Sequence, residues 1–141
     1  MPIDHRGIRV LALALIKHQG KFLACAGFDR VKKQAHYRLL GGGVEFGESC
    51  RHALFREIKE ELGLTIAKAS LLAVEENIFS FNGLPGHEVV FLYAVELRSQ
   101  RAYQRDSLHI LDSDRGHLAE WISLSDLKNK KLYPLIAKKY L

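Results

Sequence analysis

The chain has 141 residues, 48% of them hydrophobic and 26% charged, which is typical of one folded domain and excludes collagen-like and intrinsically disordered chains. Lysine and arginine (21) outnumber aspartate and glutamate (16), and the formal net charge of +5 favours polyanionic partners. No apolar run approaches the roughly 20 residues of a membrane-spanning helix, and two isolated cysteines indicate free thiols, so we expect a cytoplasmic protein with no membrane segment.

The first part of the chain predicts two strands and a loop. Residues 9–16 are apolar on both faces, as in a central strand, and we expect a turn at Gln19 and Gly20 to join them in a hairpin to a strand over residues 21–26. Residues 27–35 are polar and basic and predict a mobile loop. The basic side chains of this loop are either phosphate contacts or an ordinary solvated surface: Arg30, Lys32 and Lys33.

A helix is predicted after the glycine-rich residues 41–43. Either Glu48 or Ser49 can cap its first turn, and the helix runs to about Leu62. Gly63 then suits the end of the helix, because glycine adopts positive φ without a steric penalty. The apolar stripe that faces the core consists of Leu54, Phe55, Ile58 and Leu62.

The second half of the chain predicts further strands and two short helices. Residues 71–81 and 89–95 indicate a hairpin, residues 98–115 a polar loop, and residues 117–122 a short strand. A capping box over residues 123–126 opens a short helix, and a last helix begins near Pro134. Strands interleaved with helices predict a single α/β domain over residues 1–141.

Acidic side chains gather in one short segment. Five glutamates lie between Glu45 and Glu61, against three basic residues. At 100° per residue, three of them share an arc of about 100° beside the apolar stripe of the helix: Glu57, Glu60 and Glu61. Neighbouring like charges destabilise a helix unless a cation neutralises them, and Mg²⁺ or Mn²⁺ is the simplest such cation because hard divalent ions prefer oxygen ligands. Local ion pairs with basic neighbours are the alternative.

The spacing extends beyond these glutamates. Gly42 is followed after five residues by Glu48, and after seven more by Arg56-Glu57-Ile58-x-Glu60-Glu61-x-Gly63-Leu64. This stretch resembles the signature of the Nudix (MutT-like) hydrolases at every defined position. The resemblance implies an α/β/α sandwich with a mixed β-sheet. It also implies a pyrophosphohydrolase that uses Mg²⁺ or Mn²⁺ to cleave phosphoanhydride bonds in nucleoside triphosphates or nucleoside diphosphate-linked compounds.

The resemblance also implies roles for individual side chains. Glu57, Glu60 and Glu61 would be the metal ligands, and Arg56 would hold the glutamates by ion pairs. One of these glutamates, or Glu48, would orient or deprotonate the attacking water. The general base varies within the family and can lie outside the signature, and the other candidates are Glu88, Asp112, Asp114 and Glu120.

The substrate is less well defined by the sequence. We expect Arg38, Gly42 and Phe46 to contact it, and several aromatic residues can either stack on a base or pack in the core: Tyr37, Phe46, Phe79, Phe81, Tyr93 and Trp121. Free nucleotides, nucleotide conjugates and the 5′ end of RNA all remain open. The alternative function is a non-catalytic nucleotide or RNA sensor. The apolar segment 132–141 makes a homodimer conceivable.

Overall fold

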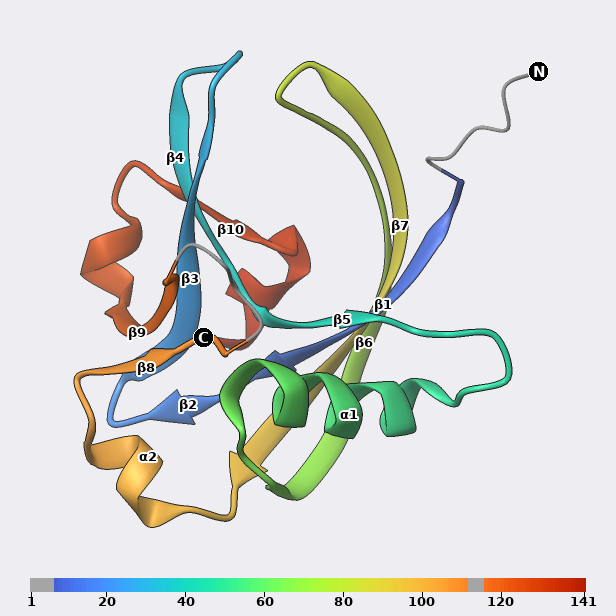
Figure 1. Cartoon of the computed structure of the whole chain (residues 1–141). Coiled ribbons are helices and arrows are strands. Elements are labelled where there is room, and N and C mark those ends of the chain that lie inside the picture. Colours follow the sequence, from blue (N-terminus) through green and yellow to red (C-terminus); the bar gives the residue numbers. More distant parts are fainter. Residues whose placement is uncertain (1–6, 112–115) are drawn as a thin grey trace.

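The computed structural model describes residues 7–111 and 116–141. Within them the strands form two mixed sheets, and the first contains the central strand of the molecule (Figure 1). Its strands are, in spatial order, β5 (Leu40–Gly43), β1 (Arg9–Leu15), β7 (Leu84–Leu97) and β6 (Ile66–Phe81). β1 pairs antiparallel with β5 and parallel with β7, while β6 and β7 form a long antiparallel hairpin. The hairpin predicted for residues 71–95 is therefore confirmed, with longer strands.

The predicted hairpin between residues 9–16 and 21–26 is wrong, because these strands belong to different sheets. β1 is apolar on both faces, and its neighbours β5 and β7 hold it inside the first sheet. The turn at Gln19 and Gly20 instead joins β2 (Lys17–His18) to β3 (Lys21–Asp29). The chain thus passes from one sheet to the other just after β1.

The second sheet contains the segment for which we predicted a mobile loop. Its strands are, in spatial order, β10 (Lys131–Tyr133), β4 (Gln34–Arg38), β3, β9 (Leu118–Ser123) and β8 (Ser107–His109), with β2 beside β3. Residues 27–35 form the tip of the β3–β4 hairpin, in which residues 27–29 and 34–35 are in the strands and only residues 30–33 form the turn, so the predicted loop is too long. The carboxylate of Asp29 accepts backbone hydrogen bonds from Val31 and Lys32, both at 2.9 Å, and so organises a tight turn within a polar sequence.

Residues 98–115 are also more regular than predicted, as far as the structure describes them. They include the short helix α2 (Gln100–Gln104) and β8. Ala102, Leu108 and Ile110 are buried, with exposed fractions of 3%, 6% and 5%. These few apolar side chains anchor a segment whose overall composition is polar.

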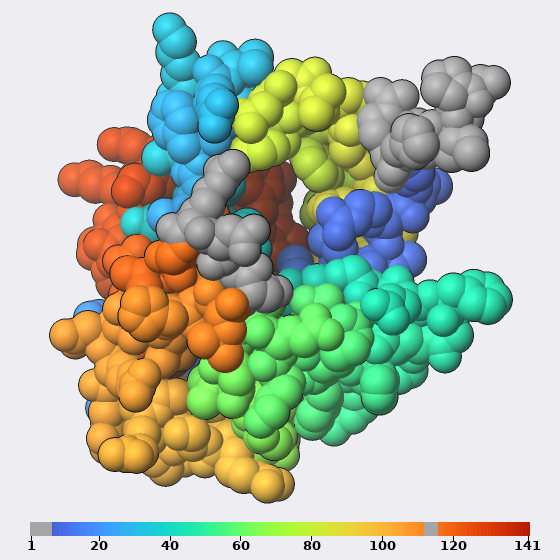
Figure 2. All heavy atoms as spheres, in the orientation of Figure 1, coloured from blue at the N-terminus to red at the C-terminus, as the bar shows by residue number. Residues whose placement is uncertain are grey.

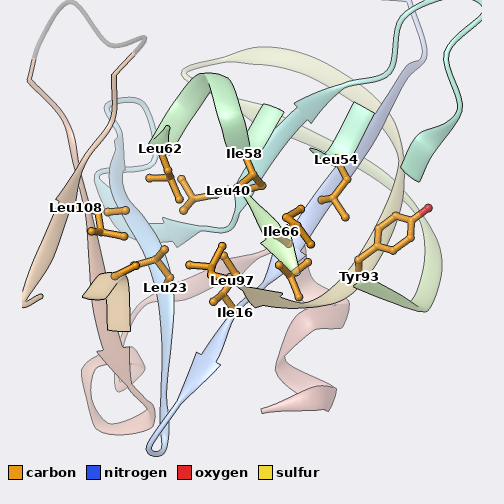
Figure 3. Packing of buried hydrophobic residues seen from close by; sticks show 14 of the residues in the cluster. Ile16, Leu23, Leu40, Leu54, Ile58, Leu62, Ile66, Tyr93, Leu97 and Leu108 are labelled. Carbon is orange, nitrogen blue, oxygen red and sulfur yellow. The ribbon is translucent and has the colours of Figure 1, made fainter. Parts of the chain in front are cut away.

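Helix α1 (Cys50–Leu62) has the predicted ends. Ser49 is the N-cap, and its hydroxyl accepts a hydrogen bond from the backbone N–H of His52 at 3.1 Å. Gly63 ends the helix in the left-handed region, with φ of 69°. Leu54 and Ile58 point from α1 into the core (Figure 3), and both are fully buried.

The two faces of β1 pack in two different cores. Ala12 and Ala14, together with Ile16 just after the strand, belong to the core beneath α1. Leu11, Leu13 and Leu15 belong to the core covered by the C-terminal 3₁₀ helices η1 (Leu124–Leu127) and η2 (Leu135–Tyr140). This arrangement confirms the α/β/α fold class, with two mixed sheets in its β layer. The two short C-terminal helices follow the predicted capping box and Pro134.

None of the helices in the described part of the chain has the length and apolar character needed to cross a membrane.

Candidate active site

Arg56 is the centre of the acidic cluster. Its Nε and Nη2 atoms pair with the two carboxylate oxygens of Glu48 at 2.7 and 2.9 Å. Its Nη1 atom lies 2.9 Å from Glu57 Oε1 and 3.3 Å from both carboxylate oxygens of Glu60. Arg56 Nη2 also donates to the carbonyl of Gly43 at 2.9 Å, so one guanidinium ties α1 to the glycine strand β5. The ion pairs implied by the resemblance are present.

Glu48 lies in the loop just before α1 and is held from several sides. Besides Arg56, it accepts a hydrogen bond from the backbone N–H of Glu45 at 3.1 Å and lies 2.8 Å from His52 Nδ1. The Arg56 guanidinium is the main reason that the pKa of Glu48 is well below its ordinary value. A carboxylate with such a low pKa is a weak proton acceptor, so the geometry favours a positioning role for Glu48 over that of a general base.

The glycine strand is shaped by the glutamates that it faces. A Cβ atom on Gly42 would lie 2.7 Å from Glu57 Oε1 and closer still to the carboxyl carbon. Gly41 has φ of 133°, which favours glycine, and its N–H donates to Glu61 Oε1 at 2.8 Å. Glu61 itself is buried, with 6% of its surface exposed. The absence of side chains at these two positions lets the strand approach both carboxylates.

The chemistry of this cluster fits a hard divalent cation, because all of its donor atoms are carboxylate oxygens. Glu57 and Glu60 share one Arg56 nitrogen, and the Glu60 side chain is 50% exposed and can turn toward a cation. Within residues 7–111 and 116–141, however, no group of three His, Cys, Asp or Glu side chains is already arranged around a metal position. The assignment of Glu57, Glu60 and Glu61 as ligands therefore remains a prediction.

A cleft of about 640 Å³ opens beside the cluster, between the β3–β4 and β6–β7 hairpins. Figure 1 shows the two hairpins rising side by side, and Figure 2 shows the opening below the lime β6–β7 hairpin. Gly41 and Gly42 contribute to its lining, which connects it to the strand that faces Glu57. Arg38 also lines the cleft, whereas Phe46 is fully exposed in the loop before α1 and lies outside the lining.

The candidate general bases outside the signature differ in whether they line the cleft. Glu88 lines the cleft from the first half of β7, with 17% of its side chain exposed. Burial raises the pKa of Glu88, although Arg9 Nη1 at 3.8 Å opposes this shift. Glu120 is exposed on β9 and does not line the cleft. Asp112 and Asp114 lie outside the described residues.

The sequence indicated Phe79 and Phe81 as possible base-stacking residues, and both line the cleft, but it did not indicate His36 and Tyr133 beside them. His36, Phe81 and Tyr133 meet at the aromatic end of the cleft, with ring centroids of His36 and the other two separated by 5.7 and 5.4 Å. These residues come from three strands far apart in the sequence. Gly27 could have indicated this packing, because a glycine inside a strand often marks the close approach of another group. The His36 ring lies against Gly27.

Comparison with known proteins identifies the class of protein. The family model of the NUDIX domain matches residues 5–141. The chain belongs to the Nudix family, as its signature predicted.

Individual relatives match shorter segments. The nucleoside triphosphatase NudI of Escherichia coli O139:H28 is 45% identical over 56 residues, which cover 39% of this chain and 40% of that protein. An RNA pyrophosphohydrolase of Ruthia magnifica is 51% identical over 41 residues, which cover 29% of this chain and 23% of that protein. The matched segments thus span less than half of these relatives' own length.

Solved structures match the fold over most of the chain. The MutT NUDIX hydrolase from Burkholderia pseudomallei has a TM-score of 0.63 and 27% identity, covering 85% of this chain and 86% of that one. The E. coli ORF135 protein has a TM-score of 0.57 and 24% identity, covering 96% and 87%. The latter similarity shows the fold alone.

Proposed function

We propose that this Nudix protein is a divalent-cation-dependent pyrophosphohydrolase that cleaves a phosphoanhydride bond in nucleoside triphosphates or in nucleoside diphosphate-linked compounds. The observation that carries the proposal is the Arg56-centred cluster of Glu48, Glu57 and Glu60, placed against the glycine strand that lines the cleft. The names of two relatives, a nucleoside triphosphatase and an RNA pyrophosphohydrolase, support substrates that contain phosphoanhydrides.

In this proposal the acidic cluster binds the cation and the cleft binds the substrate. Glu57, Glu60 and Glu61 would hold Mg²⁺ or Mn²⁺, which when bound supplies charge neutralisation at the phosphoryl oxygens and a lower pKa for a bound water. Arg56 and Glu48 fix the position of Glu57 and Glu60. Arg38, which is exposed and lines the cleft, would contact a phosphate. Most of the rate enhancement would then come from charge placed in advance opposite the reacting phosphate.

The proton acceptor is proposed to be Glu88 among the described candidates outside the signature. Glu88 lines the cleft, and its burial makes its carboxylate more basic than an exposed one. Glu120 is exposed on a strand away from the cleft lining. Glu88→Gln should therefore lower kcat, whereas Glu120→Gln should leave it nearly unchanged.

The test of the function is a substrate panel. Release of phosphate and pyrophosphate is measured with Mg²⁺ or Mn²⁺ from nucleoside triphosphates, nucleotide sugars, dinucleotides and 5′-triphosphorylated RNA. We expect turnover of at least one class, lost when EDTA removes the cation. Nucleotide binding without turnover of any compound would contradict the proposal and indicate the sensor function instead.

A further inference from the structure

His36 lines the cleft, and most of its side chain is buried. Only 8% of the residue is exposed, and neither ring nitrogen is hydrogen-bonded within the described part of the chain. The ring nitrogens of His36 are not among the fully buried unpaired atoms of the described residues, so they remain accessible from the cleft. The imidazole therefore has unused hydrogen-bonding capacity inside the cleft.

The position of the imidazole is fixed by three neighbours. Gly27 pairs directly with His36 across the β3–β4 hairpin, and a Cβ atom on Gly27 would lie 2.5 Å from His36 Nε2. Phe81 meets the ring edge-to-face at an interplanar angle of 90°, and Tyr133 at 78°. Phe81 comes from the opposite wall of the cleft, so His36 faces the space between the two hairpins.

The charge state of His36 suits the recognition of a neutral group. Burial lowers the pKa of His36, and the nearby positive charge of Arg38 lowers it further, while Asp29 has the opposite effect. At neutral pH the ring is therefore uncharged, with one nitrogen a donor and the other an acceptor. The edges of nucleobases present the same neutral donors and acceptors.

The width of the cleft at this end is set by hydrogen bonds between the two hairpin tips. Asn82 donates its backbone N–H to Asp29 Oδ2 at 3.1 Å, and its side-chain oxygen accepts from the backbone N–H of Arg30 at 2.7 Å. Lys32 Nζ adds a contact of 3.0 Å to the carbonyl of Ser80. We call these contacts the tip clasp. With its walls clasped together, the aromatic end of the cleft is organised before a ligand arrives.

Aromatic side chains on the walls complete a subsite for a planar group. Phe79 lies across Gly86 on the β6–β7 hairpin, where a Cβ atom would come within 2.9 Å of its ring, much as His36 lies over Gly27 on the facing hairpin. Both rings line the cleft. Flat rings on two facing walls leave space for a planar heteroaromatic group, and in-plane nitrogens give it direction.

We propose that His36 determines substrate specificity by hydrogen-bonding the edge of a nucleobase bound in the aromatic end of the cleft. This inference rests on the proposed function, because it assumes that the phosphates of the same molecule reach the glycine strand. The chemistry recognised is the heteroaromatic base, whether it is carried by a free nucleoside triphosphate or by the 5′ end of RNA.

The test separates base recognition from general damage to the site. Steady-state kinetics are measured for ATP, GTP, CTP, UTP and ribose 5-triphosphate, which has no base, with wild-type protein and His36→Phe. Phenylalanine keeps an aromatic ring but removes both nitrogens. For the preferred nucleotide we expect KM to rise about tenfold, as for one or two hydrogen bonds between neutral groups, with kcat changed less than about twofold. The base-free compound should be unaffected.

Two further variants sharpen the result. His36→Gln keeps a donor and an acceptor and should recover part of the lost affinity. His109→Phe is the matched control, because His109 is exposed on β8 and lies outside the cleft lining. A 5′-triphosphorylated oligonucleotide, compared with the free nucleotide, shows which source of the base is preferred. The proposal is overturned if His36→Phe leaves the relative KM values of all five compounds unchanged.

Binding measurements keep this inference distinct from the proposed hydrolysis. Dissociation constants for the same four nucleotides are measured calorimetrically with Glu60→Gln protein and with the Glu60→Gln, His36→Phe double variant, in the presence of Mg²⁺. Weaker, less base-selective binding in the double variant supports the inference even if the wild-type protein hydrolyses nothing. Equal binding by the two proteins refutes the inference even if hydrolysis is found.

Discussion

Replacing Gly42 with alanine should damage activity while leaving the protein folded. The added Cβ atom would lie 2.7 Å from Glu57 Oε1, whereas comfortable contacts need about 3.5 Å, so the carboxylate must withdraw by roughly 1 Å. A displacement of this size at a catalytic group costs about 100-fold in rate. The folded protein loses mainly the ion pair between the partly buried side chains of Glu57 and Arg56, a charge-assisted hydrogen bond worth about 1.5–3 kcal/mol.

Gly43→Ala provides a matched comparison in the same strand. Neither Gly42 nor Gly43 has positive φ, so alanine fits the backbone at both positions. A Cβ atom on Gly43 would meet only Arg9 Nη2, at an ordinary 3.6 Å, and the carbonyl that accepts from Arg56 remains. We expect Gly43→Ala to retain most of the activity.

The assay is kcat/KM for the best nucleotide in the panel, together with the free energy of unfolding from urea titration. The reasoning is refuted if Gly42→Ala retains wild-type kcat/KM, or if both alanine variants lose activity equally.

Three other expectations follow from particular contacts. Because Arg56 holds the pKa of Glu48 below its ordinary value of 4.5, Glu48 stabilises the fold above that pH and loses this effect as the pH falls. In thermal melts between pH 7 and 3, the melting temperature should fall less steeply for Glu48→Gln than for the wild type. Equal slopes would count against the ion pair. Asn82→Ala removes a tip-clasp hydrogen bond and places alanine at φ of 52°. The free energy of unfolding measured in urea should therefore fall by about 2 kcal/mol. An unchanged unfolding midpoint would mean that the clasp does not form. Ile58→Ala should cost about 2–5 kcal/mol in the same measurement, because Ile58 is fully buried on the core-facing side of α1. A cost below about 1 kcal/mol would contradict this packing.

The sequence predicted best what depends on neighbouring residues. The ends of α1 were predictable because Ser49 and Gly63 act on the backbone next to them. The carboxylate cluster was also predictable, because one turn and one helix bring Glu48, Glu57 and Glu60 to Arg56.

Pairing between distant segments was harder to predict. The turn at Gln19 and Gly20 is real, but which strand lies beside β1 depends on β7, about 80 residues later. Polar composition suggested a loop at residues 27–35, whereas Asp29 uses its carboxylate to close a hairpin there and to bind Asn82 in the facing hairpin. His36 gains its environment only when these two hairpins meet, so its place in the cleft could not be inferred from local pattern.

The most direct test of the central claim is a Mg²⁺ titration of turnover in Glu60→Gln and Glu45→Gln proteins beside the wild type. Glu60 lies on α1 within reach of Arg56, whereas Glu45 is an exposed loop residue nearby and serves as the matched control. Loss of a carboxylate ligand should lower kcat by about 100-fold or more and shift the Mg²⁺ requirement upward, with the fold intact. The account predicts this loss for Glu60→Gln and near wild-type turnover for Glu45→Gln. Wild-type turnover and an unchanged Mg²⁺ dependence in Glu60→Gln would contradict it.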